Sequence, residues 1–248
     1  MQKELNIKTK DKKIIYGTVN TPKGESNGLI IFVHGLTDNF DSHMLPNSAK
    51  YFTDKGYITY RFNLYGEKKQ ERKLKEVNLK NHVNDLNIVI KHFEKMKQKI
   101  FIVGHSFGGL TILYSNIKRI TGIILRDASI GGKELLDDVH YNSKTHMYNI
   151  DRGDGIIHII GSTMYKDFMI NPQKHLERIS KIHVPIKIIC AGNGLQVGKK
   201  YNKVAYYKAA NKPKELSIIV GAGHCFDVKG TEEKLFEETY KRIKRFSK

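Results

Sequence analysis

The residues with the clearest chemical potential lie in the segment Ile100–Leu110, which reads IFIVGHSFGGL. An apolar run typical of a strand is followed by Gly-x-Ser-x-Gly and then by a helical pattern. On a sharp strand-to-helix turn the backbone of the serine is strained and its Oγ is held clear of the sheet. Gly104 and Gly108 stand where a Cβ would collide with the neighbouring elements. The motif and its context predict Ser106 as the nucleophile of an acyl transfer.

Two backbone N–H groups are candidates to bind an oxyanion beside Ser106. The turn leaves the N–H of Phe107 at a helix N-terminus, where it can donate to a developing negative charge. The sequence His-Gly-Leu at residues 34–36 directly follows an apolar run. Such a strand end can present the N–H of Leu36 to the serine, unless it is a plain strand-to-loop turn. Two donors of this kind stabilise acyl-transfer intermediates, and His34 itself is expected to fix the loop rather than carry protons.

A candidate general base follows the last apolar run of the chain. His224 lies in the glycine-rich segment VGAGHCF, residues 220–226. A histidine at this place fits the chain order nucleophile, acid, histidine. It would take the proton of Ser106 and later donate it to the leaving group. Because the chain has 11 histidines, the position after the last strand is what singles out His224. His105, next to the serine, is expected to point away from it and to be structural.

The HG loop, GHSFGG and GAGHCF together resemble the α/β-hydrolase superfamily, and most closely its small bacterial esterases of the cinnamoyl/feruloyl-esterase and monoacylglycerol-lipase-like type. The resemblance covers nearly the whole chain, and the three motifs occur in the expected order. It implies a mostly parallel central sheet flanked by helices, and hydrolysis of carboxylic esters without a metal or another cofactor. It also implies a cap insertion of the cinnamoyl-esterase type.

The sequence departs from the family pattern at the triad acid. In the family, the strand equivalent to IKIIC (residues 186–190) is followed by G-x-x-D-x-x-V, which supplies the aspartate. This chain has AGNGLQVG at residues 191–198, which contains neither Asp nor Glu. A second family segment, usually GHG with a serine after the fourth strand, reads NLYGEKK at residues 63–69.

Three interpretations of the missing acid stay open from the sequence. Asp127, at the end of GIILRDAS, could reach His224 Nδ1 from a neighbouring strand tip, as in a few hydrolases of this fold; its other role would be a salt bridge or a cap contact. Asn193 could orient the imidazole as a neutral partner, with slower turnover. In the third interpretation the protein is weakly active or only binds a ligand. Asp227 is too close in sequence to reach Nδ1 without strain, and Asp85 is expected to be a structural anchor.

The elements that must position these residues alternate between β and α patterns. Six apolar runs predict buried parallel strands at 29–33, 57–62, 100–103, 122–125, 186–190 and 216–220. Helical patterns cover 43–55, 78–97, 107–118, 199–210 and 231–246, and the alternating segment 13–18 predicts an edge strand. Strands that alternate with helices imply an α/β fold with a parallel sheet covered on both faces.

One interval breaks this alternation. The stretch between the fourth and fifth apolar runs is far longer than a crossover helix needs. It contains helix-like pieces at 133–140 and 172–182 and the strand-like GIIHII at 155–160. We therefore predict a single domain over residues 1–248, with 130–182 as a cap or lid. An elaborated crossover is the alternative.

Composition limits the class of protein. The chain has 248 residues, 40% hydrophobic and 27% charged, as in soluble globular proteins, and it lacks the run of about 18 apolar residues that a spanning helix needs. The N-terminal sequence MQKELNIKTKDKK is unlike a signal peptide and predicts a cytoplasmic location. In that compartment Cys190 and Cys225 are expected as free thiols.

The formal net charge is +18, from 43 Lys and Arg against 25 Asp and Glu. The basic residues are spread over separate surface segments, and no aromatic-basic interleaving accompanies them. A solvated surface is therefore expected rather than nucleic-acid binding. A weak attraction to anionic surfaces stays open. The expected partner is a small-molecule ester, and no oligomeric state is predicted.

Together these features predict a serine hydrolase that cleaves small carboxylic esters through an acyl-enzyme. Ser106, His224 and Asp127 are the predicted catalytic residues. The N–H groups of Leu36 and Phe107 are the predicted oxyanion hole, and no metal or cofactor is expected. A thioesterase or a monoacylglycerol lipase is the alternative within enzymes. A non-catalytic ligand-binding protein on the same scaffold is the alternative outside them.

Overall fold

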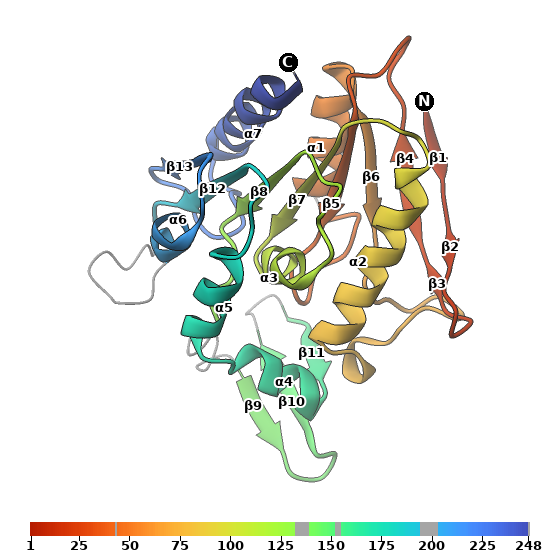
Figure 1. Cartoon of the computed structure of the whole chain (residues 1–248). Coiled ribbons are helices and arrows are strands. Elements are labelled where there is room, and N and C mark those ends of the chain that lie inside the picture. The colour runs from red at the N-terminus through yellow and green to blue at the C-terminus, as the bar shows by residue number, and fades with distance from the viewer. Residues whose placement is uncertain (43, 132–138, 152–154, 194–202, 248) are drawn as a thin grey trace.

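The computed structural model describes residues 1–42, 44–131, 139–151, 155–193 and 203–247. In these residues the central element is an eight-stranded sheet of order β1-β4-β6-β5-β7-β8-β12-β13 (Figure 1). Its strands are β1 (Gln2–Glu4), β4 (Gly17–Asn20), β5 (Leu29–Val33), β6 (Ile58–Phe62), β7 (Ile100–His105), β8 (Gly122–Arg126), β12 (Ile186–Ala191) and β13 (Lys214–Ile219). Every pairing from β6 to β13 is parallel, whereas β4 pairs antiparallel with β6 and with β1. The mostly parallel α/β sheet predicted from the sequence is confirmed.

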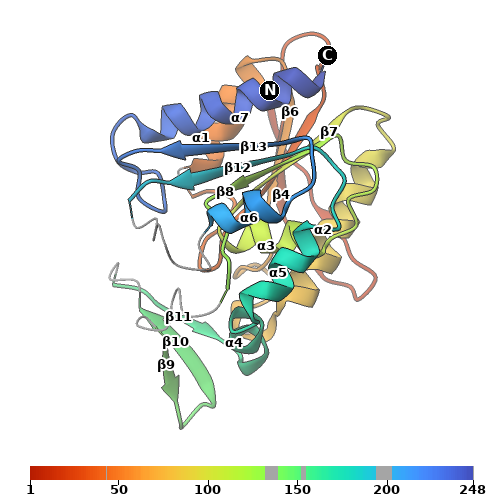
Figure 2. The same ribbon diagram turned by 60° about the vertical axis from the view of Figure 1, so that its left-hand side comes forward.

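Helices cover both faces of this sheet (Figure 2). One face packs on α1 (Met44–Asp54) and α7 (Thr231–Ser247), and the other on α2 (Leu79–Glu94), α3 (Phe107–Tyr114) and α6 (Val204–Ala209). Successive side chains of a strand point to opposite faces. In β5, accordingly, Leu29 and Ile31 belong to one hydrophobic cluster, and Ile30 and Phe32 to the other. Because both faces are buried, the strand reads as a continuous apolar run, and this is why the sequence located it.

The boundaries differ from the expected ones where the sheet ends. The predicted edge strand at 13–18 is two strands, because β3 (Ile14–Ile15) pairs with β2 (Ile7–Lys8) while β4 pairs with the central sheet. The run at 216–220 was expected to be buried, but β13 is an edge strand that pairs only with β12 among the described residues. Val220 lies beyond its end and is 83% exposed.

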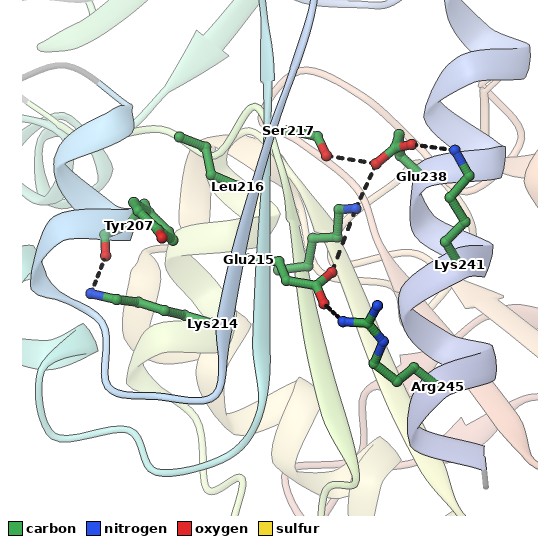
Figure 3. A pocket seen from close by; sticks show the side chains of 9 residues that line it. Tyr207, Lys214, Glu215, Leu216, Ser217, Glu238, Lys241 and Arg245 are labelled. Atoms are coloured by element: carbon green, nitrogen blue, oxygen red, sulfur yellow. Dashed lines mark hydrogen bonds and ion pairs between the residues drawn. The ribbon is translucent and has the colours of Figure 1, made fainter.

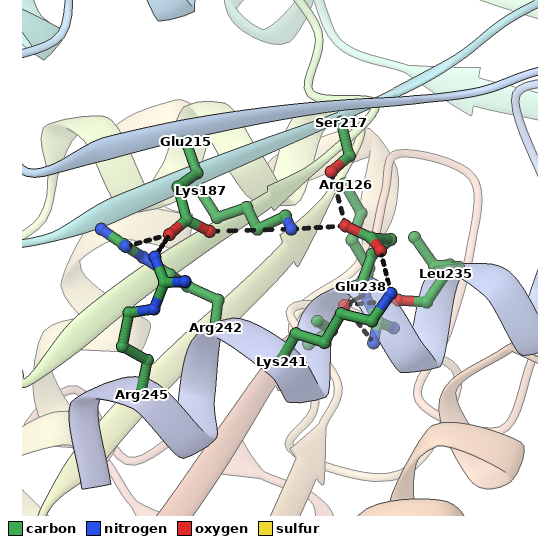
Figure 4. A network of polar contacts seen from close by, with 10 residues as sticks. Arg126, Lys187, Glu215, Ser217, Leu235, Glu238, Lys241, Arg242 and Arg245 are labelled. Carbon is green, nitrogen blue, oxygen red and sulfur yellow. Dashed lines mark hydrogen bonds and ion pairs between the residues drawn. The ribbon is translucent and has the colours of Figure 1, made fainter. Parts of the chain in front are cut away.

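Charged residues fasten α7 to the outer strands (Figure 4). Lys187, on β12, is 4% exposed, and its Nζ lies 2.6 Å from Glu238 Oε2 and 3.8 Å from Glu215 Oε2. Arg242 Nη1 lies 2.5 Å from Glu215 Oε1, and Ser217 donates to Glu238 Oε2 at 2.6 Å. We call Lys187, Glu215, Ser217, Glu238, Lys241, Arg242 and Arg245 the α7 network.

Between β8 and β12 the described residues form a second sheet and two helices. The antiparallel sheet has the order β11-β10-β9, and the elements are β9 (Val139–Asn142), β10 (Met147–Asp151), β11 (Ile157–Ile160), α4 (Ser162–Phe168) and α5 (Pro172–Ile179). The helix expected at 133–140 is wrong where it is described, because Val139 and His140 pair with β10 as a strand. Residues 132–138 lie outside the described part of the chain.

Candidate active site

Ser106 sits on a strained turn between β7 and α3. Its backbone dihedrals are φ 51° and ψ −122°, a conformation that side-chain-bearing residues rarely adopt. The turn is held by its own hydrogen bonds: the N–H of Ser106 donates to Arg126 O at 3.1 Å, and its carbonyl accepts from Gly109 and Ser129 N–H at 3.0 Å each. These bonds fix the strand-to-helix turn that the sequence motif predicted.

The two glycines of the motif are needed for close packing. A Cβ on Gly104 would lie 2.6 Å from Ile112 Cδ1 and 2.7 Å from the carbonyl oxygen of Gly108. A Cβ on Gly108 would lie 2.6 Å from the carbonyl oxygen of His34 and would overlap another carbonyl oxygen of β5. Real Cβ atoms do not approach backbone so closely. The steric reason for both glycines is therefore present in the structure.

Three residues predicted from the sequence form a hydrogen-bonded chain. His224 Nε2 lies 3.0 Å from Ser106 Oγ, and His224 Nδ1 lies 2.5 Å from Asp127 Oδ2. Because the carboxylate accepts at Nδ1, we assign the proton of the neutral imidazole to that nitrogen. Nε2 then accepts from the serine hydroxyl. The three side chains follow β7, β8 and β13, whose carboxyl ends meet at one edge of the sheet.

Asp127 is held firmly in a buried position. Its side chain is 2% exposed, its N–H donates to Ile189 O at 2.7 Å, and its Oδ1 accepts from the N–H of Ala191 at 2.9 Å. Burial alone would raise the pKa of this carboxyl. The hydrogen bond from His224 and the charge of Lys203 outweigh burial and hold the pKa below its ordinary value. Asp127 is therefore ionised and oriented towards the imidazole.

The other acid candidates lie elsewhere. Asn193 donates from Nδ2 to Gly221 O at 2.9 Å, so its side chain fastens the base of the histidine loop rather than the imidazole. Asp85 accepts from Arg72 at 2.7 and 3.0 Å, as expected of an anchor. Residues 194–198 of the segment AGNGLQVG lie outside the described part of the chain. Of the acids weighed from the sequence, Asp127 is the one placed at Nδ1.

Two further residues contact the triad, and one of them, Lys203, was not predicted from the sequence. His105 Nε2 donates to the backbone carbonyl of His224 at 2.9 Å, and the two rings lie 4.8 Å apart. Burial lowers the pKa of His105 to about 3, so this ring is neutral. Lys203, just before α6, pairs with Asp127 Oδ2. His105 was expected to be structural, but its contact shows that it supports the loop of His224.

The HG loop is positioned beside the nucleophile. His34 Nδ1 lies 2.7 Å from Gly35 O, and His34 Nε2 accepts from Leu64 N–H at 3.0 Å, so both ring nitrogens hold the loop. Burial lowers the pKa of His34. A Cβ on Gly35 would lie 3.1 Å from Ser106 Cβ. Leu36 follows at once and is buried. The role of its N–H and that of Phe107 in an oxyanion hole stays a prediction.

The segment between β8 and β12 contacts the turn that carries Ser106. Phe168, on α4, stacks on Phe107 with ring centroids 4.8 Å apart. Asp167 Oδ2 accepts from the N–H of Leu79 at 2.7 Å, which ties α4 to the start of α2. Helix α4 is therefore packed against the residue that follows the nucleophile.

An open pocket of about 500 Å³ lies beside β13 (Figure 3). Its lining includes Lys187 and Glu215, which lie near the amino ends of β12 and β13, whereas the triad lies beyond the carboxyl ends. Most of its charged lining residues are paired with one another in the α7 network.

Within the described residues no cluster of His, Cys, Asp and Glu suited to a metal ion is found. In the same residues no helix combines the length and apolar character that a membrane crossing requires.

Comparisons with known proteins agree with this architecture. Residues 24–141 match the family described as serine aminopeptidase, S33. The esterase domain of a Rhodothermus marinus protein superposes with a TM-score of 0.75 at 16% identity, over 100% of both chains. Est1E from Butyrivibrio proteoclasticus, with bound ferulic acid, gives 0.75 at 20% identity, over 96% of this chain and 99% of that one. A Paleococcus ferrophilus monoacylglycerol lipase gives 0.72 at 16% identity, over 94% and 98%. The curated proteins gave no significant match.

The chain has the α/β-hydrolase fold. The sheet order, the elbow after β7 and the superposition on esterase and lipase structures over nearly the whole chain carry this conclusion. The resemblance drawn from the HG, GHSFGG and GAGHCF segments is thereby confirmed. At these identities the likeness establishes the fold, and the chemistry has to be argued from the site.

Proposed function

We propose that the protein is a serine hydrolase of small carboxylic esters. The observation that carries this proposal is the continuous chain from Ser106 Oγ through both nitrogens of His224 to Asp127 Oδ2, with distances of 3.0 and 2.5 Å. A serine bonded to an imidazole, which is in turn oriented by a buried carboxylate, is the arrangement that activates a hydroxyl for attack on a carbonyl.

In the proposed reaction Ser106 Oγ attacks the ester carbonyl while its proton passes to His224 Nε2. The N–H groups of Leu36 and Phe107 stabilise the oxyanion. When the tetrahedral intermediate collapses, His224 donates the proton to the departing alkoxide, and an acyl-enzyme is left. A water molecule, deprotonated by His224, then releases the acid and restores Ser106. Asp127 stays ionised throughout and stabilises the imidazolium.

Residues 130–182 are proposed to act as the cap over the substrate. The stacking of Phe168 on Phe107 supports this role, because it packs α4 against the residue that follows the nucleophile. A cap in this position would select the acyl and alcohol groups, and it would distinguish esters from thioesters or monoacylglycerols. The cytoplasmic location and the small-molecule partner stay predictions.

Hydrolysis of p-nitrophenyl acetate tests the proposal. Wild type should turn over the ester, and Ser106→Ala should lower kcat by about 10⁴-fold or more because the nucleophile is gone. Ser26→Ala is a matched control, because Ser26 precedes the amino end of β5 and its side chain bonds to exposed Gln98. Folded wild type without turnover, or equal turnover in Ser106→Ala, would contradict the proposal and favour the ligand-binding interpretation.

A further inference from the structure

The acid of the site is shared by two nitrogen groups. Lys203 Nζ contacts Asp127 Oδ2, the same oxygen that accepts from His224 Nδ1. Nζ also lies 3.5 Å from Nδ1 itself. The side chain of Lys203 is 22% exposed, so water screens this charge only in part. A partly exposed cation therefore lies close to the imidazole of His224, on which positive charge develops during the proposed reaction.

The other carboxylate oxygen of Asp127 is hydrogen-bonded to neither His224 nor Lys203. Oδ1 is occupied by the N–H of Ala191 at 2.9 Å. All of the interaction with His224 and Lys203 thus falls on Oδ2. In a triad the carboxylate stabilises the imidazolium, and a second cation on the same oxygen weakens that stabilisation and repels the imidazolium directly.

In the described part of the chain, the other groups around the imidazole carry little positive charge. His105, on β7, is neutral because burial lowers its pKa to about 3. Cys190, on β12, is a neutral thiol because burial raises its pKa to about 12. In the histidine loop, Cys225 is in no disulfide among the described residues, and the carboxylate of Asp227 lies 3.6 Å from the position that a Cβ on Gly223 would take. Among the residues that the structure describes, Lys203 is therefore the cation that acts most directly on the pair formed by Asp127 and His224.

We propose that Lys203 is a positioning residue that takes part of the charge of Asp127 and thereby destabilises the imidazolium form of His224. The consequence is that Asp127 stabilises a positive charge on His224 less than it would if Lys203 were absent. The proposal rests on the proposed function, since it assigns a role in the same triad.

The test is the pH dependence of kcat/KM for p-nitrophenyl acetate in wild type, Lys203→Met and Lys203→Arg. In Lys203→Met the pKa of the acid limb should rise by about one unit, because the charge is lost at a short distance. Lys203→Arg should keep the wild-type limb, since it keeps the charge. Lys208→Met is the matched control, because it removes an exposed lysine from the same helix.

A second readout separates this proposal from the proposed function. The NMR titration of the His224 Cε1–H signal reports the imidazole directly, and it needs no turnover. The same upward shift is expected in Lys203→Met and in Lys203→Gln, which guards against a folding defect in one variant. The role of Lys203 would be overturned if the His224 titration in a folded variant matched that of wild type. It would also be overturned if the maximum of kcat/KM fell while the acid limb of its pH profile did not move. If folded wild type did not hydrolyse p-nitrophenyl acetate at all, the proposed function would be overturned instead.

Discussion

Strand β12 contributes to two clusters in which a lysine is paired with a carboxylate. One cluster lies near its amino end and the other at its carboxyl end, and their roles differ. Near its amino end, Lys187 enters the α7 network, where Glu238 and Glu215 receive several cations at once. At its carboxyl end, Ala191 holds Asp127, which receives Lys203 and His224 on one oxygen. Both clusters pair opposite charges beside the sheet, but only the second includes a titratable base within reach of a nucleophile.

The two clusters differ in how deeply the basic group is buried and in which partners it has. In the α7 network Lys187 is 4% exposed and lies between two carboxylates, so that removal of one partner leaves a buried charge poorly compensated. In the triad, His224 is 32% exposed and has one nitrogen on Asp127 and the other on Ser106. The first arrangement stabilises the packing of α7, and the second leaves a proton free to move. The two regions should therefore fail in different measurements.

The largest expected effect belongs to the triad. Asp127→Asn should lower kcat for p-nitrophenyl acetate by about 10⁴-fold, because an amide no longer fixes the tautomer or stabilises the imidazolium. The matched control is Asp227→Asn, a nearby aspartate that the sequence also offered as an acid. Wild-type kcat in Asp127→Asn, or an equal loss in Asp227→Asn, would remove Asp127 from the role of triad acid.

The corresponding change in the α7 network should alter stability instead. Glu238→Gln should lower the free energy of unfolding by about 3 kcal/mol, because Lys187 loses its nearer carboxylate in a buried site. Denaturation in urea measures this loss, and kcat should stay near the wild-type value. A large loss of kcat with unchanged stability would show that the division between the two regions is wrong.

The acid side of the stability curve sharpens the same contrast. Burial would raise the pKa of Glu238, but hydrogen bonds from Lys187, Lys241 and Ser217 outweigh it and lower the pKa to about 2, from an ordinary 4.5. A carboxyl with a depressed pKa in the folded state stabilises the protein above the unfolded pKa. That contribution is lost as the pH falls from about 4.5 towards about 2. Glu238→Gln should flatten this part of the curve, and an unchanged slope would contradict the assignment.

The smallest expected effect concerns the support of His224. His105→Phe keeps a ring against the imidazole but removes the donor to the His224 carbonyl. Loss of one such hydrogen bond should lower kcat about tenfold, with the acid limb of the pH profile unmoved because His105 is neutral. A shifted limb would mean that His105, and not only Lys203, sets the charge around His224.

Much of the site was predictable because its signals are local. The apolar run, the two glycines and the helical pattern around Ser106 lie within a few residues, and the steric reason for the glycines is intrinsic to a strand–helix turn. His224 was located by its place after the last apolar run. Continuous apolar runs also located the inner strands β5, β6, β7, β8 and β12 of the central sheet, since those strands are buried.

The parts that could not be predicted depend on contacts between distant segments. Lys203 and Asp127 are 76 residues apart, and nothing in the pattern around either residue indicates that they meet. His105 reaches the carbonyl of a residue 119 positions away. Val139 and His140, at the start of β9, were expected to end a helix, because their pairing with β10, not their own sequence, decides their conformation. The choice among acids needed the packing of β8 beside β12.

The most direct test of the account is covalent labelling with a fluorophosphonate, followed by peptide mapping. The probe reacts with a serine only if a base activates it and donors stabilise the oxyanion, so it reports the assembled site without assuming a substrate. We expect a single adduct on Ser106 at neutral pH, which is lost in Ser106→Ala and forms much more slowly in Asp127→Asn. No adduct on folded protein, or an adduct on another serine, would contradict it.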